Sequence, residues 1–142
     1  MNYRTFGNLD WKPSALGFGT MRLPVIGNDT SAIDEPQAIA MIRAGIDGGI
    51  NYIDTAYPYH GGMSETLVGK ALGSGYREKV RLATKMPSWL IHSQEDMTRY
   101  LEEQMRRLQT EHIDFYLLHA LNAGYWHALR DADVIAWSEA QI

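Results

Sequence analysis

Four residues along this chain have side chains that together can polarise and protonate a carbonyl group: Asp54, Tyr59, Lys85 and His119. An ammonium group beside a phenol favours the phenolate and lowers the pKa of the phenol from about 10, so a tyrosine beside a lysine can act as an acid. We expect Tyr59 to take this role beside Lys85. A carboxylate next to the lysine keeps it charged and oriented, which suits Asp54. A histidine can donate a hydrogen bond to a carbonyl oxygen, which suits His119.

These side chains supply no electrons. A reaction that reduces the carbonyl therefore needs a hydride donor from outside the chain, and a nicotinamide is the usual one.

Three of the four residues directly follow a strand-like run. The runs are 50–53, 80–84 and 113–118, and they are followed by Asp54, Lys85 and His119 respectively. Pro58 prevents the first of these strands from continuing, so we expect Tyr59 on a turn just beyond its carboxyl end. Catalytic groups gather at the carboxyl ends of the strands in parallel α/β proteins. The sequence therefore predicts one common site at that edge of a sheet.

Strand-like runs centred near residues 17, 52, 82 and 116 recur with helical patterns between them. This alternation is typical of consecutive βα units and predicts a parallel sheet. Four units fit either half of an eight-unit barrel or a small doubly wound sheet, and the period does not choose between them. Asp54, Lys85 and His119 are expected to face a common opening at the carboxyl ends of the strands, and this placement favours the barrel.

The segments that position these residues carry their own signals. Residues 2–6 and 11–15 predict a β-hairpin before the main fold, and residues 16–20 predict a first buried strand. Asp34 with Gln37 forms a capping signature for a helix that ends near Gly48. The remaining signals are Ser64 as the N-cap of a helix to Leu72, Ser93 at the start of a third helix, a solvated face with Glu102, Glu103, Arg106 and Arg107, and a last helical region from Tyr125 onward.

Composition excludes several classes of function. The chain has 142 residues, a net charge of -4 and no cysteine. We expect one soluble globular unit with no nucleic-acid or membrane partner, and cytoplasmic by default because no signal peptide is recognised. Without cysteine, disulfides and thiolate metal sites are excluded within these residues.

Competing sites are poorly supported by the spacing of the residues. The four other histidines lack a partner at ligand spacing, so we predict surface or packing roles for them and no metal; they are His60, His92, His112 and His127. Ser64 is not in a nucleophile elbow, which argues against a hydrolase triad. Gly17 and Gly19 do not complete a dinucleotide-binding fingerprint, because position 22 is an arginine.

The motifs around these residues resemble those of the aldo-keto reductases. The resemblance is carried by Asp54-Thr55-Ala56 followed by Tyr59, by Lys85 after Ala83-Thr84, by His119 after Leu117-Leu118, by the run from Leu16 to Arg22, and by Ser64-Glu65. It implies a (β/α)8 TIM barrel of which residues 1–142 are the N-terminal half, with 1–15 as a hairpin cap and 16–142 as the first four βα units.

The same resemblance implies the function and the site. The protein would be an NADP-dependent alcohol dehydrogenase type of enzyme, reducing aldehydes or ketones with NADPH, or less often NADH, and without a Rossmann domain. Asp54, Tyr59, Lys85 and His119 would form the catalytic tetrad, with Tyr59 as proton donor. The cofactor would lie near Asp54 and near the segment Gly19, Thr20, Met21 and Arg22, and Trp89 would line the substrate pocket.

Family members are roughly twice this length, the size of an eight-unit barrel. We therefore expect either a truncated gene product or part of a longer one. His119-Ala120-Leu121-Asn122 resembles the branch that carries a C-terminal ferredoxin-like iron-sulfur domain, which would lie outside these residues. The alternative function is a catalytically silent half barrel, or a regulatory or binding module of the same fold. A truncated chain would also expose its sheet edges and self-associate.

Overall fold

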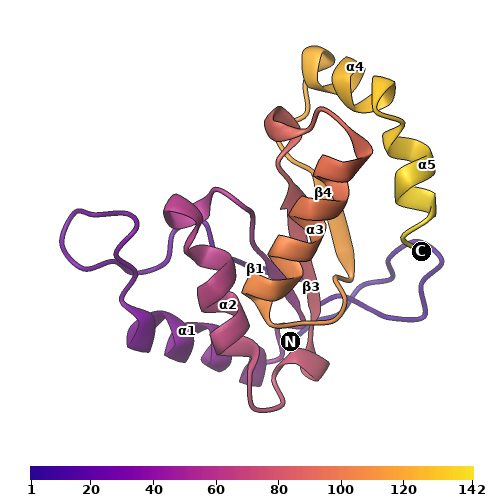
Figure 1. The fold of residues 1–142 in the computed structure, drawn as a ribbon. Coiled ribbons are helices and arrows are strands. Elements are labelled where there is room, and N and C mark those ends of the chain that lie inside the picture. The colour runs from indigo at the N-terminus through magenta and orange to yellow at the C-terminus, as the bar shows by residue number, and fades with distance from the viewer.

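A computed structural model describes all residues from 1 to 142 and shows a four-stranded parallel sheet (Figure 1). The strands lie in the order of the sequence: β1 (Phe18–Gly19), β2 (Tyr52–Asp54), β3 (Arg81–Met86) and β4 (Phe115–Leu118). Every pairing between neighbours is parallel. In a doubly wound sheet the spatial order of the strands reverses at a switch point, whereas in a barrel each strand lies next to the one that precedes it in the sequence. The observed order therefore decides between the two predicted architectures, and the chain is a partial barrel.

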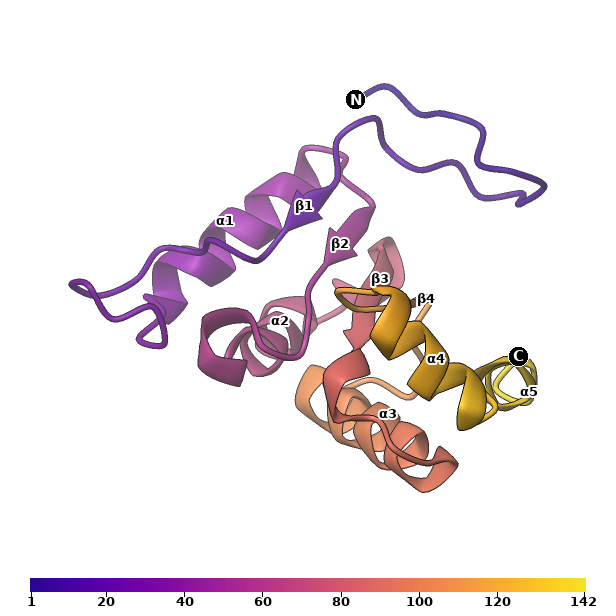
Figure 2. The same cartoon turned by 90° about the horizontal axis from the view of Figure 1, so that it is seen from above.

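Helices follow each strand and cover the outer side of this sheet. They are α1 (Glu35–Asp47), α2 (Ser64–Leu72), α3 (Gln94–Leu108), α4 (Ala123–Asp131) and α5 (Val134–Glu139), with the short 3-10 helices η1 (Tyr59–Gly62), η2 (Arg77–Lys79) and η3 (Ser88–Leu90). Seen from above, α1, α2 and α3 follow one another around the outside of the curved sheet (Figure 2). The βα alternation predicted from the sequence is confirmed.

Two of the predicted helix starts are confirmed by their hydrogen bonds. The carboxylate of Asp34 accepts from the backbone N–H of Gln37, and the hydroxyl of Ser93 accepts from that of Asp96. Both bonds satisfy backbone donors that a first helical turn leaves without partners.

The predicted N-cap role of Ser64 is wrong. Ser64 is the first residue of α2, and the preceding cap residue, Met63, makes no side-chain capping bond. The Ser64 hydroxyl is buried and bonds instead to the hydroxyls of Thr20, at 2.8 Å, and Thr55, at 3.0 Å. A short hydroxyl side chain satisfies its hydrogen bonds with whatever partner tertiary packing brings close, and here two strand ends outcompete the helix terminus.

The first strand is shorter and more exposed than the buried run predicted for 16–20. Only Phe18 and Gly19 form ladder pairs, with Ile53 and Asp54, and Leu16 and Gly19 are exposed. β1 lies at the edge of the sheet and pairs on one side only, so packing covers less of it.

The predicted N-terminal hairpin is present as a short antiparallel pairing. Tyr3 and Ser14 form its single bridge, supported by a backbone bond from Arg4 to Pro13. The aromatic rings of the hairpin then pack against rings of the sheet, with centroid distances of 5.5–6.4 Å among Phe6, Trp11, Tyr52 and Phe115. These ring contacts attach the segment to the sheet, while residues 1–10 are exposed to solvent.

The core has two parts. The larger lies between the sheet and the helices α1 and α2, and includes Ile42, Ile53, Leu67 and Leu82. The smaller joins β3 and α3 to the last two helices around Met86, Met97, Leu129 and Trp137. Burying this apolar surface fixes the helices against the sheet and so fixes the strand ends.

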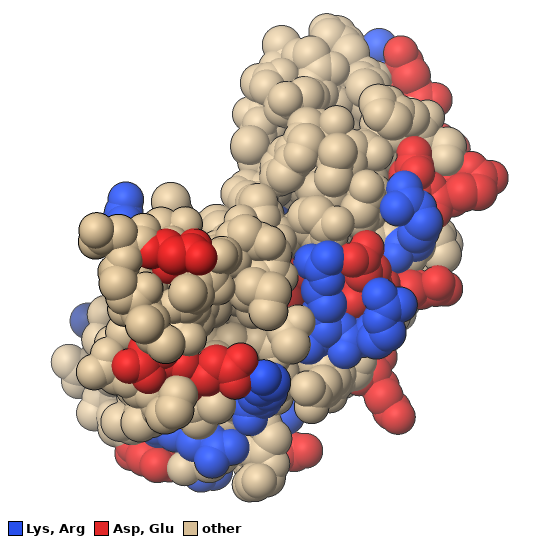
Figure 3. Space-filling view, turned by 60° about the vertical axis from the view of Figure 1, so that its left-hand side comes forward, with Lys and Arg blue, Asp and Glu red and all other residues tan.

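The last helical region is divided, in contrast to the single region predicted from Tyr125. α4 ends at Asp131 and α5 begins at Val134, because Asp133 between them has a left-handed φ of 58°. No helix of the chain is both long and apolar enough to cross a membrane. On the face shown in Figure 3, basic side chains lie next to acidic ones.

Candidate active site

The ammonium group of Lys85 lies at the centre of a polar cluster at the carboxyl ends of β2 and β3. It donates to the carboxylate Oδ1 of Asp54 at 2.7 Å and to the backbone oxygen of Thr55 at 2.6 Å. It also lies 3.4 Å from the phenol oxygen of Tyr59. The side chains of Lys85 and Asp54 are only 13% and 28% exposed, so solvent weakens their attraction less than at an open surface.

Strand register brings Asp54 and Lys85 to the same face. Asp54 pairs with Ala83, and Lys85 follows Ala83 by two residues on β3. Side chains two apart on a strand point to the same side of the sheet. The lysine therefore reaches back across the end of β2, where the Thr55 carbonyl provides its second acceptor.

Tyr59 and His119 complete the cluster from two different segments. Tyr59 begins η1, and its ring lies edge-on to His119 with a centroid distance of 5.8 Å. His119 follows β4, and its backbone N–H donates to the oxygen of Met86 at 3.0 Å. The structure thus brings together all four residues that the sequence selected. Trp89 lies beside them, 5.4 Å from His119 between ring centroids.

The surroundings of His119 disfavour the charged form of its imidazole. Burial, and secondarily the positive charge of Lys85, lower its pKa below the ordinary value of 6.5 because both disfavour the imidazolium. Its Nδ1 atom is buried without a hydrogen-bond partner. A neutral imidazole carries one N–H donor, as hydrogen bonding to a carbonyl oxygen requires.

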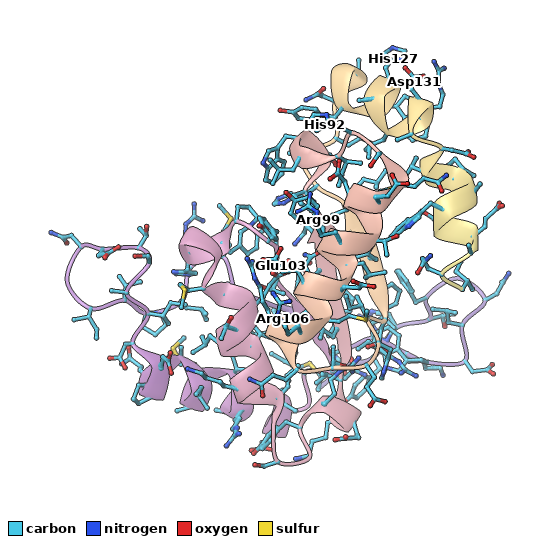
Figure 4. All side chains as sticks on the ribbon, in the orientation of Figure 1. His92, Arg99, Glu103, Arg106, His127 and Asp131 are labelled. Atoms are coloured by element: carbon cyan, nitrogen blue, oxygen red, sulfur yellow. The ribbon has the colours of Figure 1, made fainter.

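His60 fixes the position of the loop that carries Tyr59. It is buried, accepts from the backbone N–H of Leu23 through Nε2 at 3.0 Å, and donates through Nδ1 to the oxygen of Thr30 at 2.6 Å. Both ring nitrogens are occupied, so this histidine packs the loop rather than acting on a substrate. The other three histidines are exposed, and Figure 4 shows His92 and His127 on different parts of the surface.

The segment predicted to contact a cofactor ends β1 beside this cluster. Gly19 has open space where a side chain would start, and Met21 and Arg22 are exposed. Arg22 makes no ion pair, so its charge is free for an anion. Thr20 differs from the others, because it is fully buried and its hydroxyl contacts Asp54 and Ser64. It therefore supports the site from beneath.

Several residues that shape the site were missed by the sequence reasoning. The Thr55 carbonyl, the Ser64 hydroxyl and the carboxylate of Glu65 are all buried contributors. Arg107 was assigned to a solvated face, but its guanidinium binds Glu65 and is only 22% exposed. The available signal was a pair of polar residues, Ser64 and Glu65, opening a helix that is otherwise largely buried.

The cluster stands at the rim of the sheet rather than in a closed pocket. The largest surface cavity, about 500 Å³, lies between α3, β4 and α5 and includes none of the four residues. No group of three or more His, Cys, Asp or Glu side chains is arranged to hold a metal ion.

Comparison with known proteins gives a consistent result. The model of the Aldo/keto reductase family matches residues 15–127. Methylglyoxal reductase YeaE of Escherichia coli (strain K12) is 40% identical over 106 residues, which are 71% of this chain and 37% of that protein.

Solved structures of aldo-keto reductases are similar to this chain both in fold and in sequence. The thermostable aldo-keto reductase Tm1743, in complex with the inhibitor epalrestat, superposes with a TM-score of 0.77 and 29% identity over all of this chain and 52% of that one. An aldo-keto reductase from Klebsiella pneumoniae in complex with NADPH gives a TM-score of 0.72 and 34% identity over 92% of this chain and 44% of that one. The chain therefore spans about half the length of these structures, and less of the curated relative.

Proposed function

The chain belongs to the aldo/keto reductase family, and on that premise we propose that the protein is an NAD(P)H-dependent oxidoreductase that reduces aldehydes or ketones to alcohols. The observation that carries the proposal is the ammonium of Lys85, held by Asp54 at 2.7 Å and lying 3.4 Å from the hydroxyl of Tyr59. This contact is the one that a tyrosine needs to release a proton, because a nearby positive charge stabilises the phenolate left behind.

In the proposed reaction, Tyr59 donates its proton to the carbonyl oxygen as the carbonyl carbon accepts a hydride. Lys85 stabilises the phenolate, and Asp54 keeps Lys85 in place. His119, neutral near pH 7, donates a hydrogen bond that orients the carbonyl oxygen and stabilises its developing charge. Trp89 forms one wall of the substrate site.

The residues at the end of β1 fit a nicotinamide cofactor. A reduced nicotinamide supplies the hydride when bound. Gly19, which has open space where a side chain would start, pairs with Asp54 in the sheet. The exposed side chains of Met21 and Arg22 follow it in the chain, and an unpaired guanidinium suits a phosphate group. NADPH in the Klebsiella pneumoniae relative supports the same cofactor here.

We further propose that residues 1–142 provide the N-terminal half of a complete barrel. Residues 1–15 would be its hairpin cap and residues 16–142 its first four βα units, in agreement with the parallel order of β1 to β4. The iron-sulfur domain suggested by the residues after His119 stays a prediction.

The test is oxidation of NADPH by the full-length gene product with a panel of aldehydes and ketones, comparing the natural protein with Tyr59→Phe. Loss of a general acid lowers kcat by about 100-fold or more, while the ring still packs. Tyr125→Phe, on α4, is the matched control and should retain full activity. Equal turnover by the Tyr59→Phe protein would refute the mechanism, and absence of turnover in the natural protein would favour a regulatory or binding module.

A further inference from the structure

Glu65 is a carboxylate with no solvent exposure, located in the first turn of α2. Its Oε1 atom accepts hydrogen bonds from the hydroxyl of Thr84 at 2.7 Å and from the amide of Gln104 at 2.6 Å. Its Oε2 atom accepts from the guanidinium of Arg107 at 3.3 Å. Burial raises the pKa of Glu65, and the bonds from Thr84 and Gln104 oppose that rise. The two oxygens thus face different parts of the molecule.

The first oxygen is linked to the strand that carries the lysine. Thr84 immediately precedes Lys85 on β3, and the amide of Gln104 also donates to the backbone oxygen of Lys85 at 3.1 Å. Gln104 is fixed in turn, because its carbonyl accepts from the hydroxyl of Tyr116 on β4 at 2.6 Å. Glu65 is therefore connected to the backbone of Lys85 through the side chain of Gln104.

The second oxygen is linked to the loop that carries the tyrosine. Arg107 lies over the ring of Tyr57, with 4.5 Å from its guanidinium carbon to the ring centroid. Tyr57 precedes Tyr59 by two residues and packs edge-on against Tyr100 at 5.3 Å. Arg107 is held by the carboxylates of Glu65 and Glu103, so the position of this loop depends on both.

Helix packing leaves this arrangement little freedom. A Cβ atom added at Gly69, one turn after Glu65, would lie 2.7 Å from the backbone oxygen of Arg107 and 2.8 Å from that of Leu108. The backbones of α2 and α3 are thus in direct contact. Since α2 cannot approach further, the carboxylate has a fixed place between β3 and α3.

We propose that Glu65 is a positioning residue that sets the distance between Lys85 and Tyr59. One carboxylate oxygen holds the strand that carries the lysine, and the other holds the loop that carries the tyrosine. The inference rests on the proposed reductase function. The controlled quantity is the 3.4 Å contact between the lysine ammonium and the tyrosine hydroxyl, and a displacement of about 1 Å in a reacting group can cost about 100-fold in rate.

Three variants of the full-length gene product test this proposal. Glu65→Gln keeps an acceptor for Thr84 and Gln104 but removes the charge that faces Arg107, and Arg107→Met removes the donor and the cation over Tyr57. We expect each to lower kcat about tenfold with KM for NADPH and carbonyl unchanged, and the double variant to be no slower than the slower single one. Arg106→Met is the matched control, since Arg106 is exposed on the same helix (Figure 4), and it should behave as the natural protein.

A second measurement separates positioning from catalysis. The rate at which an amine-acylating reagent modifies Lys85, relative to the half-exposed Lys79 and measured by mass spectrometry, reports how firmly the ammonium is held. We expect this ratio to rise in Glu65→Gln and Arg107→Met and not in Arg106→Met. If the natural protein shows no reductase activity, the proposed function fails and this ratio alone decides the role of Glu65.

Two results would overturn the inference. One is an Arg107→Met protein with unchanged kcat and an unchanged acylation ratio, even if its melting temperature falls, because the network would then only stabilise packing. The other is a pair of single variants whose effects multiply in the double variant. If Glu65→Gln does not fold, Arg107→Met decides by itself, since its side chain is partly exposed.

Discussion

The ion pair between Asp54 and Lys85 allows a quantitative test of the site. Their charged atoms are 2.7 Å apart, so the direct attraction is about 6 kcal/mol at an effective dielectric constant of about 20. Solvation offsets much of this, because the Asp54 side chain is 28% exposed. A hydrogen bond between charged groups contributes about 1.5–3 kcal/mol net, compared with about 1 kcal/mol for a neutral one.

Asp54→Asn preserves the shape and one acceptor but removes the charge, which leaves a loss of about 1–2 kcal/mol. If the pair orients Lys85 in the transition state, kcat falls about tenfold. Asp54→Ala removes the acceptor as well, and we expect a loss of about 100-fold. The assay is steady-state oxidation of NADPH by the full-length gene product with an aldehyde that the natural protein reduces.

The control is Asp47→Asn, which makes the same change in the exposed pair with Lys79, 3.3 Å apart and remote from the site. This variant should retain the natural kcat. An Asp54→Asn enzyme within about twofold of the natural kcat would show that Asp54 does not hold Lys85 for the reaction, and the proposed division of roles would be wrong.

Three further predictions concern stability and assembly. Folding lowers the pKa of His119. The contribution of His119 to the free energy of unfolding is therefore complete above pH 6.5 and is lost as the pH falls toward the folded-state pKa. Denaturant titrations at several pH values should show this pH-dependent contribution in the natural protein but not in His119→Gln. Burial raises the pKa of Asp114, but bonds from the Leu82 N–H and from Arg77 lower it more, so its stabilisation is present above pH 3.8 and disappears on acidification. Asp114→Ala should therefore reduce the free energy of unfolding by about 3 kcal/mol near neutral pH and by much less in acid. Finally, we propose that the 142-residue chain self-associates through the open edges of β1 and β4; sedimentation that shows a folded, monodisperse monomer would contradict this.

Sequence patterns predicted the structure correctly where the interacting groups are close together along the chain. The caps at Asp34 and Ser93 formed as expected, because the donors they satisfy are only three residues away. Ser64 carries the same type of side chain and did not cap its helix, because its hydroxyl bonds to two threonines that follow β1 and β2. The rule for capping is correct, but the competing partners lie outside the first helical turn, 9 and 44 residues away.

The sequence by itself determined the order of the βα units and placed Asp54, Lys85 and His119 near strand ends, because residue type and the alternation of strand-like and helical patterns are local properties. Only the tertiary structure decided that β1 to β4 lie in sequence order, that Thr55 supplies a second acceptor to Lys85, and that the carboxylate of Glu65 is buried. These features arise from packing between segments that are tens of residues apart. Hydrogen-bond partners inside a core are set by which helices and strands meet, and one-dimensional periodicity does not contain that information.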